Sequence, residues 1–411
     1  MIAHAVIGQE PTYLPYAIDS SFYRQVDSKV NDYMHSKKTF PAAVILATKD
    51  GKVVFEKAYG VQQRYDMGKS LKQTFATTPE TLFDMASCTK VLATTQSIMK
   101  LCYEGKIDLK EKVTTYLPNF GQGGKEKITI EQLLTHTSGL AQWRPFYLYT
   151  NQKSKVLELI ENEVLKFKDG KVHYSDLGFQ TLGFIIEAVT GKAMDIYVET
   201  QLFASLGMLH TKYLPLQKGI TKNEIAATSW GNPFEKQMID EEHYPGFSYD
   251  CTKDKEAFEK FTLWREYTLV GEVNDGNAGM ANAGVAGHAG LFARAKDIAI
   301  LGQLMLNGGI YNDIRLYDEE TLNLFTTNHT GNAKRGLGFE LNASYMGKFS
   351  SMATFGHSGF TGTHLIFDKI HNVQIIILTN KQNNGLNKAK SYPSTYSFAR
   401  EIAEIFQKKL F

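Results

Sequence analysis

The stretch DMASCTKVLATT, Asp84–Thr95, places a lysine three residues after a serine in a run that is otherwise almost free of charge. The pair is Ser87 and Lys90, and the next charged residue after it is Lys100. A helix with so little charge around its circumference is usually buried. Lysine is seldom buried without a partner, because taking an ammonium group out of water is costly. Either Lys90 interrupts the apolar pattern by chance, or it acts on the serine stacked beside it.

The spacing of Ser87 and Lys90 suits nucleophilic catalysis. Residues i and i+3 of a helix lie on the same face, and a serine hydroxyl is a poor nucleophile until a base removes its proton. Burial disfavours the charged form of lysine, so we expect the amine of Lys90 to accept that proton near neutral pH. Ser87 is also expected at a helix N-terminus, where backbone N–H groups favour negative charge. The Ser-x-x-Lys spacing is common by chance, so it does not settle the matter alone.

The composition is ordinary for a globular protein. The 411 residues are 43% hydrophobic and 21% charged, and 45 basic against 43 acidic residues give a net charge of +2, which predicts no nucleic-acid or membrane-surface role. No stretch approaches the ~18 apolar residues of a membrane span, and the visible N-terminus has no signal-peptide pattern. Cys88, Cys102 and Cys251 are scattered, and the eleven histidines lack ligand spacing, so we expect no disulfide framework, no metal and no cofactor.

The two ends of the chain predict the same kinds of element. An amphipathic helix is expected over 19–37, followed by two strands within 42–60 that an Asp-Gly dipeptide joins as a hairpin. Towards the other end, 359–368 and 373–380 predict a second strand pair, and 394–410 predicts a helix. All four strands can share one antiparallel sheet, and each face of that sheet needs helical cover.

We therefore expect an α/β fold whose antiparallel sheet comes from both chain ends, is flanked by helices and carries an inserted, mostly helical region. Residues 1–86 hold the N-terminal helix and sheet strands, 87–345 form the mostly helical part with Ser87 and Tyr174, and 346–411 complete the α/β part. No repeat or low-complexity tract separates these parts, so one structural unit is expected.

A second motif consists of Tyr174, Ser175 and Asp176, just before a helix pattern with apolar positions at Leu182 and Ile185. Either Ser175 or Asp176 makes a good N-cap, which is the purely structural interpretation. In the catalytic interpretation, Tyr174 relays protons beside the serine–lysine pair, and nearby positive charge favours its phenolate.

A third motif consists of His357, Ser358 and Gly359, which open a strand. Structurally, this is a glycine-rich bend in an edge strand. Functionally, the glycine lets a substrate run alongside the strand, and the backbone N–H of Phe360 can face an oxyanion.

Three further residues are expected to be structural. His136 and His288 lie in turn-like segments and are predicted to hold loops together by hydrogen bonds. Cys88 follows the serine directly, but a buried cysteine usually behaves as a small hydrophobic residue.

Taken together and in this order, the three motifs resemble the serine β-lactamase and penicillin-binding-protein superfamily. The tyrosine motif is similar to that of the class C-like branch, which includes D-alanyl-D-alanine peptidases and family VIII carboxylesterases. Three further segments agree: Leu133–Leu140, Gly284–Ala299 and Gly356–Thr363. The segment GVAGHAGLF resembles low-molecular-mass carboxypeptidases of that superfamily. The resemblance implies a β-lactamase-like fold.

The resemblance also implies roles for single residues. Ser87 becomes the acylated nucleophile, Lys90 its proton acceptor and Tyr174 the relay to the leaving group. The backbone N–H groups of Ser87 and Phe360 become the oxyanion hole, where each donor is worth about 2.7–4 kcal/mol. Substrate-binding positions follow for four residues: Asp176, His357, Ser358 and Gly359.

Two departures from the superfamily pattern affect the expected activity. Asp176 stands where β-lactamases usually have asparagine; if ionised, it favours the ammonium form of Lys90, so Tyr174 or a protonated Asp176 must compensate. His357 takes the place of the strand lysine, and with a pKa near ~6.5 it is only partly charged at pH 7. Both changes count against an efficient β-lactamase and favour a peptidase or an esterase.

The expected function is a serine hydrolase that forms an acyl-enzyme on Ser87, of the D-alanyl-D-alanine carboxypeptidase type. A class C-like β-lactamase and a family VIII carboxylesterase are alternatives, and a non-catalytic protein that binds cell-wall peptide is an alternative of another class. The expected partners are a small molecule or a D-alanyl peptide, with β-lactams as inhibitors. Relatives act in the cell envelope, so an exported protein is expected, although the visible N-terminus leaves a cytoplasmic location open.

Overall fold

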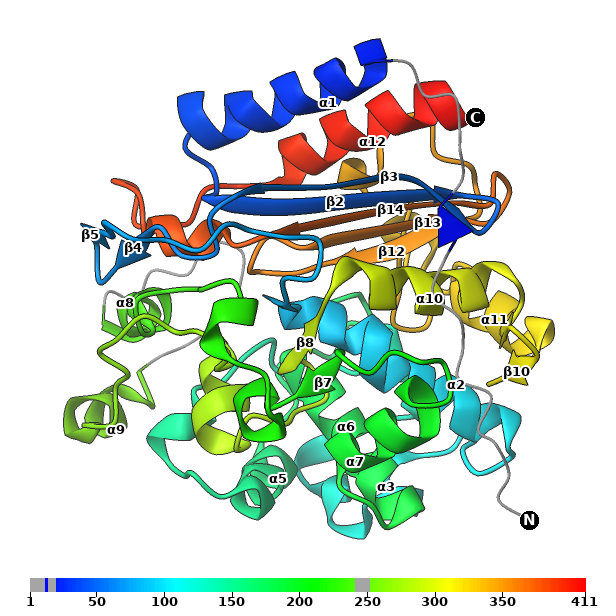
Figure 1. Cartoon of the computed structure of the whole chain (residues 1–411). Coiled ribbons are helices and arrows are strands. Elements are labelled where there is room, and N and C mark those ends of the chain that lie inside the picture. The colour runs from blue at the N-terminus through cyan, green and yellow to red at the C-terminus, as the bar shows by residue number, and fades with distance from the viewer. Residues whose placement is uncertain (1–11, 14–19, 241–251) are drawn as a thin grey trace, which may run out of the picture.

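A seven-stranded sheet forms the centre of the computed structural model, which describes residues 12–13, 20–240 and 252–411 (Figure 1). Residue 19 of the predicted first helix and Cys251 lie outside the described residues. The strand order is β1-β3-β2-β14-β13-β12-β11, and the pairs are antiparallel except β1 with β3. The strands are β1 (Thr12–Tyr13), β2 (Ala42–Lys49), β3 (Lys52–Gly60), β11 (Glu340–Leu341), β12 (Thr354–Ser358), β13 (His364–Asp368) and β14 (Val373–Thr379).

Strands from both chain ends meet in the middle of this sheet. Strand β2 pairs antiparallel with β14, with Val44 opposite Leu378, and continues into β3 through a tight turn at Asp50 and Gly51. Both turn residues have positive φ values, 51° and 76°, as an Asp-Gly hairpin turn requires. The predicted antiparallel sheet is confirmed, and so is the hairpin.

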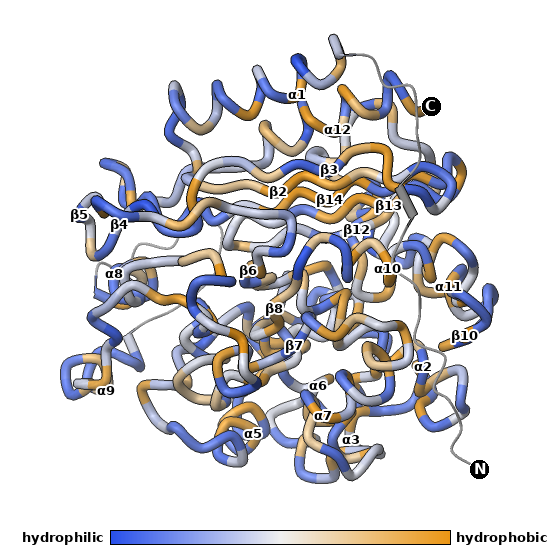
Figure 2. The backbone as a smooth tube through the Cα atoms, in the orientation of Figure 1, coloured by the Kyte–Doolittle hydropathy of each residue, from blue (hydrophilic) through white to orange (hydrophobic). Residues whose placement is uncertain are grey.

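Helices cover both faces of the sheet (Figure 1). On one face α1 (Ser20–Asn31) and α12 (Tyr396–Leu410) lie side by side and share a core of aromatic and aliphatic side chains with the strands. On the other face α10 (Ala295–Leu306) packs against β14 and β2. Figure 2 shows that β2 and β14, which lie between these two helical layers, consist mainly of hydrophobic residues. The predicted first helix is α1 followed by a wider helical turn, Asp32–Ser36.

The middle of the chain is mainly helical, as expected, and carries several short strands. Its elements, together with three short strands that precede them, are β4 (Tyr65–Asp66), β5 (Lys69–Ser70), β6 (Phe83–Asp84), α2 (Thr95–Tyr103), α3 (Val113–Tyr116), α4 (Ile130–Leu134), α5 (Lys153–Asn162), α6 (Asp176–Thr190), α7 (Met194–Val198), β7 (Lys212–Tyr213), α8 (Pro233–Asp240), α9 (Lys255–Lys260), β8 (Leu291–Ala293), β9 (Ile310–Tyr311), β10 (Ile314–Arg315) and α11 (Glu319–Thr326). Both α10 and β11 also come from 87–345 and join the α/β part, so the inserted region is continuous with the sheet.

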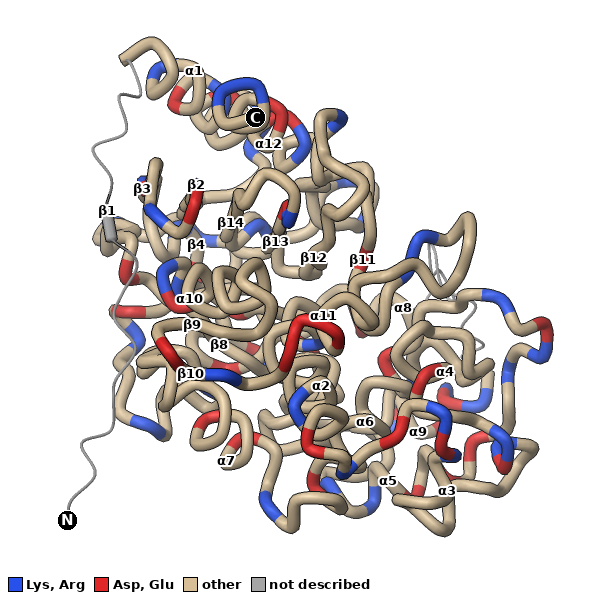
Figure 3. The backbone as a smooth tube through the Cα atoms, turned by 90° about the vertical axis from the view of Figure 1, so that its right-hand side faces the viewer, with Lys and Arg blue, Asp and Glu red and all other residues tan. Residues whose placement is uncertain are grey.

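Charges of both signs are interspersed on the molecule. Figure 3 shows basic and acidic residues alternating along loops and helix ends. None of the helices in the described part of the chain is long and apolar enough to cross a membrane.

Candidate active site

The chain turns sharply just before Ser87. Strand β6 ends at Asp84, whose Oδ1 accepts a hydrogen bond of 2.8 Å from the amide of Ala86. Ala86 has a φ of 44°, a left-handed backbone that costs a non-glycine residue about 1 kcal/mol or more. Thr361, between β12 and β13, braces this segment by donating from Oγ1 to the Asp84 carbonyl at 2.7 Å. Ser87 lies on the short turn Ala86–Cys88, ahead of a wide turn and helix α2.

The side chains of Ser87, Lys90 and Tyr174 meet at this turn. Lys90 Nζ donates to Ser87 Oγ at 2.9 Å, and the Tyr174 hydroxyl donates to the same oxygen at 2.8 Å. Lys90 is 0% exposed. Its ammonium group also donates to the His288 carbonyl at 3.2 Å and pairs with Asp176 Oδ1 at 2.7 Å. Residues from distant segments of the sequence therefore surround one serine oxygen, and the ammonium group has three oxygen partners.

The charge on Lys90 differs from the expectation. Burial acts to lower the pKa of Lys90, but the Asp176 carboxylate and the Tyr174 oxygen raise it, and the resulting pKa lies above its ordinary value. Lys90 is therefore an ammonium ion in this site. The prediction that burial would leave a neutral amine near pH 7 is wrong, because the aspartate of the Tyr-Ser-Asp motif is in direct contact with the ammonium.

Tyr174 is a neutral phenol. Burial raises the pKa of Tyr174 to about 12, and the nearby Lys90 charge does not offset that effect, so the expectation of a favoured phenolate is wrong. The Tyr174 ring packs on His136, with the ring centroids 4.5 Å apart. His136 Nδ1 in turn accepts a hydrogen bond of 3.0 Å from the Ser175 amide, so His136 holds the tyrosine loop in place, the kind of role predicted for it.

Ser175 and Asp176 have different roles: Ser175 caps the helix, and Asp176 pairs with Lys90. Ser175 is the N-cap of α6, and its hydroxyl oxygen accepts from the Gly178 amide at 3.2 Å. Asp176 is the first residue of α6 and points its carboxylate at Lys90. The helix start therefore orients both the tyrosine before it and the carboxylate that pairs with the lysine.

His357 is a buried, neutral imidazole on β12. A carbonyl oxygen can only accept, so the 2.7 Å contact between His357 Nδ1 and the Ser358 carbonyl puts the proton on Nδ1. Burial lowers the pKa of His357 to about 4; the Glu340 carboxylate opposes that shift, and the Lys90 and Arg335 charges add to it. The prediction that this histidine is partly charged at pH 7 is wrong, because its surroundings exclude water. It cannot supply the missing strand cation.

Gly359 allows the strand to approach the turn that carries Ser87. A Cβ atom at this position would lie 2.6 Å from the Met85 carbonyl and 2.1 Å from Thr363 Oγ1, so no larger residue fits. The next residue, Phe360, is 43% exposed. Its backbone amide is not among the donors of the described hydrogen bonds, which leaves that N–H available to a ligand.

A cleft of about 430 Å³ opens in front of Ser87. Its lining includes every sequence-predicted site residue except Lys90, which is buried beneath Ser87, namely Ser87, Tyr174, Asp176, His357, Ser358, Gly359 and Phe360. It also includes residues that sequence reasoning missed or assigned a structural role: Phe234, Glu235, Asn274, Asp275, His288, Arg335, Glu340, Lys381 and Tyr396. Within the described ranges, no group of three or more His, Cys, Asp or Glu side chains is placed to hold a metal ion.

Two of the missed residues are cations. Lys381 follows β14, is 9% exposed and places Nζ 5.4 Å from the centre of the Phe360 ring. Burial lowers its pKa to about 8, and no carboxylate of the described residues forms an ion pair with it. Arg335 contacts Glu340 at 3.3 Å and lies 5.8 Å from the Tyr174 ring centre. Nothing in the local sequence marks either residue, because each reaches the cleft through the fold.

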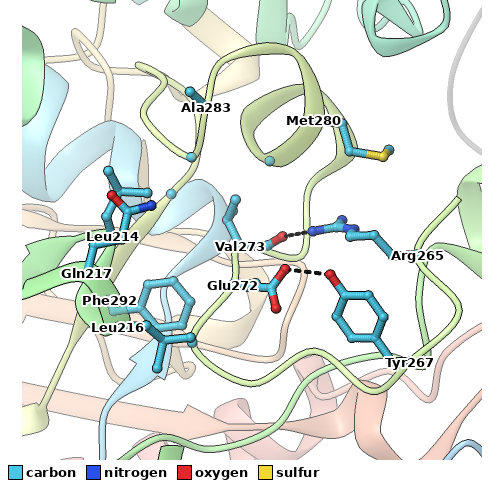
Figure 4. A pocket seen from close by; sticks show the side chains of 14 residues that line it. Leu214, Leu216, Gln217, Arg265, Tyr267, Glu272, Val273, Met280, Ala283 and Phe292 are labelled. Carbon is cyan, nitrogen blue, oxygen red and sulfur yellow. Dashed lines mark hydrogen bonds between the residues drawn. The ribbon is translucent and has the colours of Figure 1, made fainter. Parts of the chain in front are cut away.

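A second hollow, of about 540 Å³, is lined in part by Arg265, Tyr267 and Glu272 of the loop that follows α9 (Figure 4). Its wall is mainly apolar, with Arg265 donating to the Val273 carbonyl at 2.7 Å and Tyr267 to Glu272 at 2.7 Å. None of the sequence-predicted site residues lines it.

The family model described as Beta-lactamase matches residues 26–393. The chain belongs to the Beta-lactamase family. It is thereby a member of a superfamily of serine hydrolases, and the predicted membership of the serine β-lactamase and penicillin-binding-protein superfamily is confirmed.

Curated relatives in the Beta-lactamase family cover most of the chain. A protein of Escherichia coli strain K12, provisionally named a D-alanyl-D-alanine carboxypeptidase, is 34% identical over 377 residues, which cover 87% of this chain and 82% of that protein. The N-acetylmuramyl-L-alanine amidase of Bacillus subtilis strain 168 is 36% identical over 379 residues, which cover 87% and 81% of the two chains.

Solved structures share the fold at lower identity. A penicillin-binding protein homologue from Caulobacter crescentus has a TM-score of 0.68 at 19% identity and covers 95% of this chain and 98% of its own. A family VIII carboxylesterase has a TM-score of 0.67 at 18% identity and covers 96% and 98%. The predicted β-lactamase-like fold is confirmed.

Proposed function

We propose that this chain hydrolyses D-alanyl peptides through an acyl-enzyme on Ser87, as a D-alanyl-D-alanine carboxypeptidase. One observation carries the proposal: Ser87 Oγ lies within hydrogen-bond distance of both Lys90 Nζ, at 2.9 Å, and the Tyr174 hydroxyl, at 2.8 Å, at the base of a cleft. Two donors on one serine oxygen stabilise the negative charge that grows there as the hydroxyl is deprotonated.

Asp176 supplies the missing proton acceptor in this proposal. As substrate enters, one proton moves from the Lys90 ammonium to the Asp176 carboxylate across their 2.7 Å contact. The resulting neutral amine takes the proton of Ser87 while Oγ bonds to the substrate carbonyl carbon. The pair then holds one proton more than before, and Tyr174 delivers it to the leaving amine nitrogen as the C–N bond breaks. No proton has to be exchanged with bulk water during acylation.

The oxyanion of the tetrahedral intermediate is assigned to the backbone N–H groups of Ser87 and Phe360. Gly359 supports this assignment, because its missing side chain lets the strand approach Met85, two residues before the nucleophile. Each such donor contributes about 2.7–4 kcal/mol to the transition state.

Lys381 supports a substrate that carries a carboxylate. It is a nearly buried cation of the cleft for which the described residues supply no ion-pair partner, and a D-alanyl peptide ends in a carboxylate that would fill that place. Asp176, His357 and Ser358 line the same cleft and are assigned to the remaining polar groups of the substrate.

A second candidate is an amidase that cleaves the bond between N-acetylmuramic acid and L-alanine. It is favoured by the Bacillus subtilis relative of that name, which is 36% identical. A class C-like β-lactamase, a carboxylesterase and a non-catalytic protein that binds wall peptide are further candidates. For each of these candidate functions we propose a site of action in the cell envelope.

Mass spectrometry of the intact protein tests these proposals. The chain is mixed with a D-alanyl-D-alanine peptide, an N-acetylmuramyl-L-alanine peptide, a penicillin and a short-chain ester, and adducts are followed over time. We expect release of D-alanine, a long-lived penicillin adduct and no adduct in Ser87→Ala. Release of N-acetylmuramic acid alone supports the amidase, and rapid loss of the penicillin adduct supports the β-lactamase. Unchanged labelling of Ser87→Ala removes Ser87 as the nucleophile, and no adduct with any probe favours a binding protein.

A further inference from the structure

His288 and Asp275 form a hydrogen-bonded pair in the wall of the Ser87 cleft. His288 Nε2 lies 2.9 Å from Asp275 Oδ1, and both residues line the cleft. The same carboxylate oxygen accepts from the amide of Ala278 at 2.8 Å. Arg265 fixes the preceding loop by donating to two of its backbone carbonyls at 2.7 and 2.8 Å, the first of which is drawn in Figure 4. Asp275 is therefore held in place from both sides along the chain.

This pairing determines which nitrogen of His288 carries the proton. Burial acts to raise the pKa of Asp275. The His288 ring and the hydrogen bonds to the carboxylate lower this pKa by more than burial raises it, so the net pKa lies below its ordinary value. An ionised carboxylate can only accept, so His288 Nε2 carries hydrogen and, in the neutral ring, Nδ1 carries the lone pair.

His288 Nδ1 is an unused acceptor. The residue is 1% exposed, and Nδ1 has no hydrogen-bond partner among the described residues. Leaving a buried acceptor unpaired costs roughly 1–3 kcal/mol, and such a group in a native site calls for a bound ligand atom or an ordered water. Because His288 lines the Ser87 cleft, we expect that partner to be a substrate atom or a reacting water.

His288 lies next to the nucleophile. Lys90 Nζ contacts Ser87 Oγ at 2.9 Å and the backbone carbonyl of His288 at 3.2 Å. A single ammonium group therefore joins the serine to the backbone of the residue that carries the unpartnered imidazole nitrogen, and both residues line the same cleft.

His357 also presents an unpartnered nitrogen, Nε2, in the same cleft. Its Nδ1–H faces the Ser358 carbonyl instead of a carboxylate, and burial lowers its pKa to about 4. Its Nε2 can accept a hydrogen bond, but the ring does not become an imidazolium at neutral pH. His288 differs because its Nε2 faces the Asp275 carboxylate, the arrangement that orients a general base.

We propose that His288, oriented by Asp275, is the general base of deacylation, a role that depends on the acyl-enzyme proposed above. His288 Nδ1 takes one proton from a water whose oxygen bonds to the ester carbonyl carbon of acylated Ser87. The C–Oγ bond then breaks, and Ser87 Oγ takes a proton from Lys90. The imidazolium proton returns to the Lys90 amine through water in the cleft, so the free acid leaves and every group recovers its starting state.

Burst kinetics with p-nitrophenyl acetate separate acylation from deacylation in His288→Gln and Asp275→Asn. The burst reports formation of the acyl-enzyme, and the steady state reports its hydrolysis. In His288→Gln we expect a burst rate within about threefold of the wild type and a steady-state rate lower by about 10²–10⁴-fold, which is the usual contribution of a general base. Asp275→Asn should follow in the same direction, because an amide can donate to Nε2 and reverse the tautomer.

The burst amplitude counts folded, acylatable sites, so each rate is normalised to it. Accumulation of a stable acetyl adduct on Ser87 in either variant, seen by intact mass, supports the proposal. Equal losses in burst and steady state, or an unchanged steady state, overturn it and leave the dyad a structural role. If His288→Gln does not fold, Asp275→Asn decides by the same criteria. A wild type that shows neither burst nor adduct instead overturns the proposed function itself.

Discussion

Asp176→Asn removes one charge from a buried ion pair and nearly preserves its shape. Lys90 is 0% exposed, and its Nζ lies 2.7 Å from Asp176 Oδ1. Removing one partner of a buried pair destabilises a protein by roughly 3–5 kcal/mol, because the other charge stays uncompensated. The amide oxygen of asparagine can still accept from the ammonium group, so we expect the lower end, about 3 kcal/mol at pH 6.

This loss of stability should shrink as the pH rises. In the variant, Lys90 lacks the carboxylate that raises its pKa, so burial dominates and the amine becomes neutral at a lower pH. In the wild type the raised pKa of Lys90 acts the other way. The stabilisation from the pair is fully present below the unfolded-state pKa of ~10.4 and is lost only as the pH rises through the higher folded-state value. Between pH 6 and 9 the wild-type contribution is therefore constant.

Denaturant unfolding at pH 6, 7.5 and 9 measures the effect, and kcat/KM measured over the same range tests the proton transfer. We expect kcat/KM of Asp176→Asn to fall by about 10²-fold or more and to rise with pH, as the variant depends on bulk water to deprotonate Lys90. A matched control is Asp195→Asn, because Lys218 contacts Asp195 at 2.8 Å but also Glu199 at 2.6 Å, and is partly exposed. The control should lose less than about 1 kcal/mol. An equal loss of stability at pH 6 and 9, with unchanged activity, would refute the reasoning.

Three further measurements follow from the site. Lys381→Met should raise KM about tenfold for a D-alanyl peptide acid and leave KM unchanged for the same peptide with a C-terminal amide. In the wild type, KM for the acid should rise above pH 8, where the Lys381 ammonium loses its proton. Equal changes in KM for the acid and the amide would contradict this. Because burial lowers the pKa of His357 to about 4, the shape of kcat/KM between pH 5 and 7.5 should be the same in His357→Gln, and a limb near ~6.5 that disappears in the variant would show a charged histidine. Gly359→Ala puts a Cβ 2.6 Å from the Met85 carbonyl and should slow single-turnover acylation by about 10²–10³-fold by displacing the Phe360 N–H; acylation at the normal rate would exclude that amide from the oxyanion hole.

Much of the fold could be predicted because its signals are local. The Asp50-Gly51 dipeptide specifies a turn by its own backbone preference, and apolar periodicity marked the helices and strands at both ends. That β2 and β14 lie in one sheet was predicted from one further argument: strands with apolar faces bury those faces by forming one sheet covered by helices.

The charge states of the site could not be predicted from the motifs alone. Whether burial or an ion pair dominates at Lys90 depends on the 2.7 Å contact with Asp176, which only the fold determines. The same limit applies to His357, whose neutral form results from its burial. A sequence shows which charged residues are present but not the distances between them. Those distances decide whether burial or ion pairing has the larger effect on a pKa.

The missed residues reach the cleft by long-range packing. Lys381 is carried there by the end of β14, and Asp275 by a loop that Arg265 fixes. His288 belongs to a recognisable glycine-rich segment, but its pairing with Asp275 depends on how the loop folds back on itself.

The brace between Thr361 and the Asp84 carbonyl joins residues 277 positions apart in the sequence. During translation the ribosome makes the turn that holds Ser87 long before it makes the hydroxyl that braces it, and β14 follows later still. Contacts of such long range form slowly and late. On the proposed function, an emerging chain therefore carries its nucleophile before the hydroxyl that braces the turn has been made.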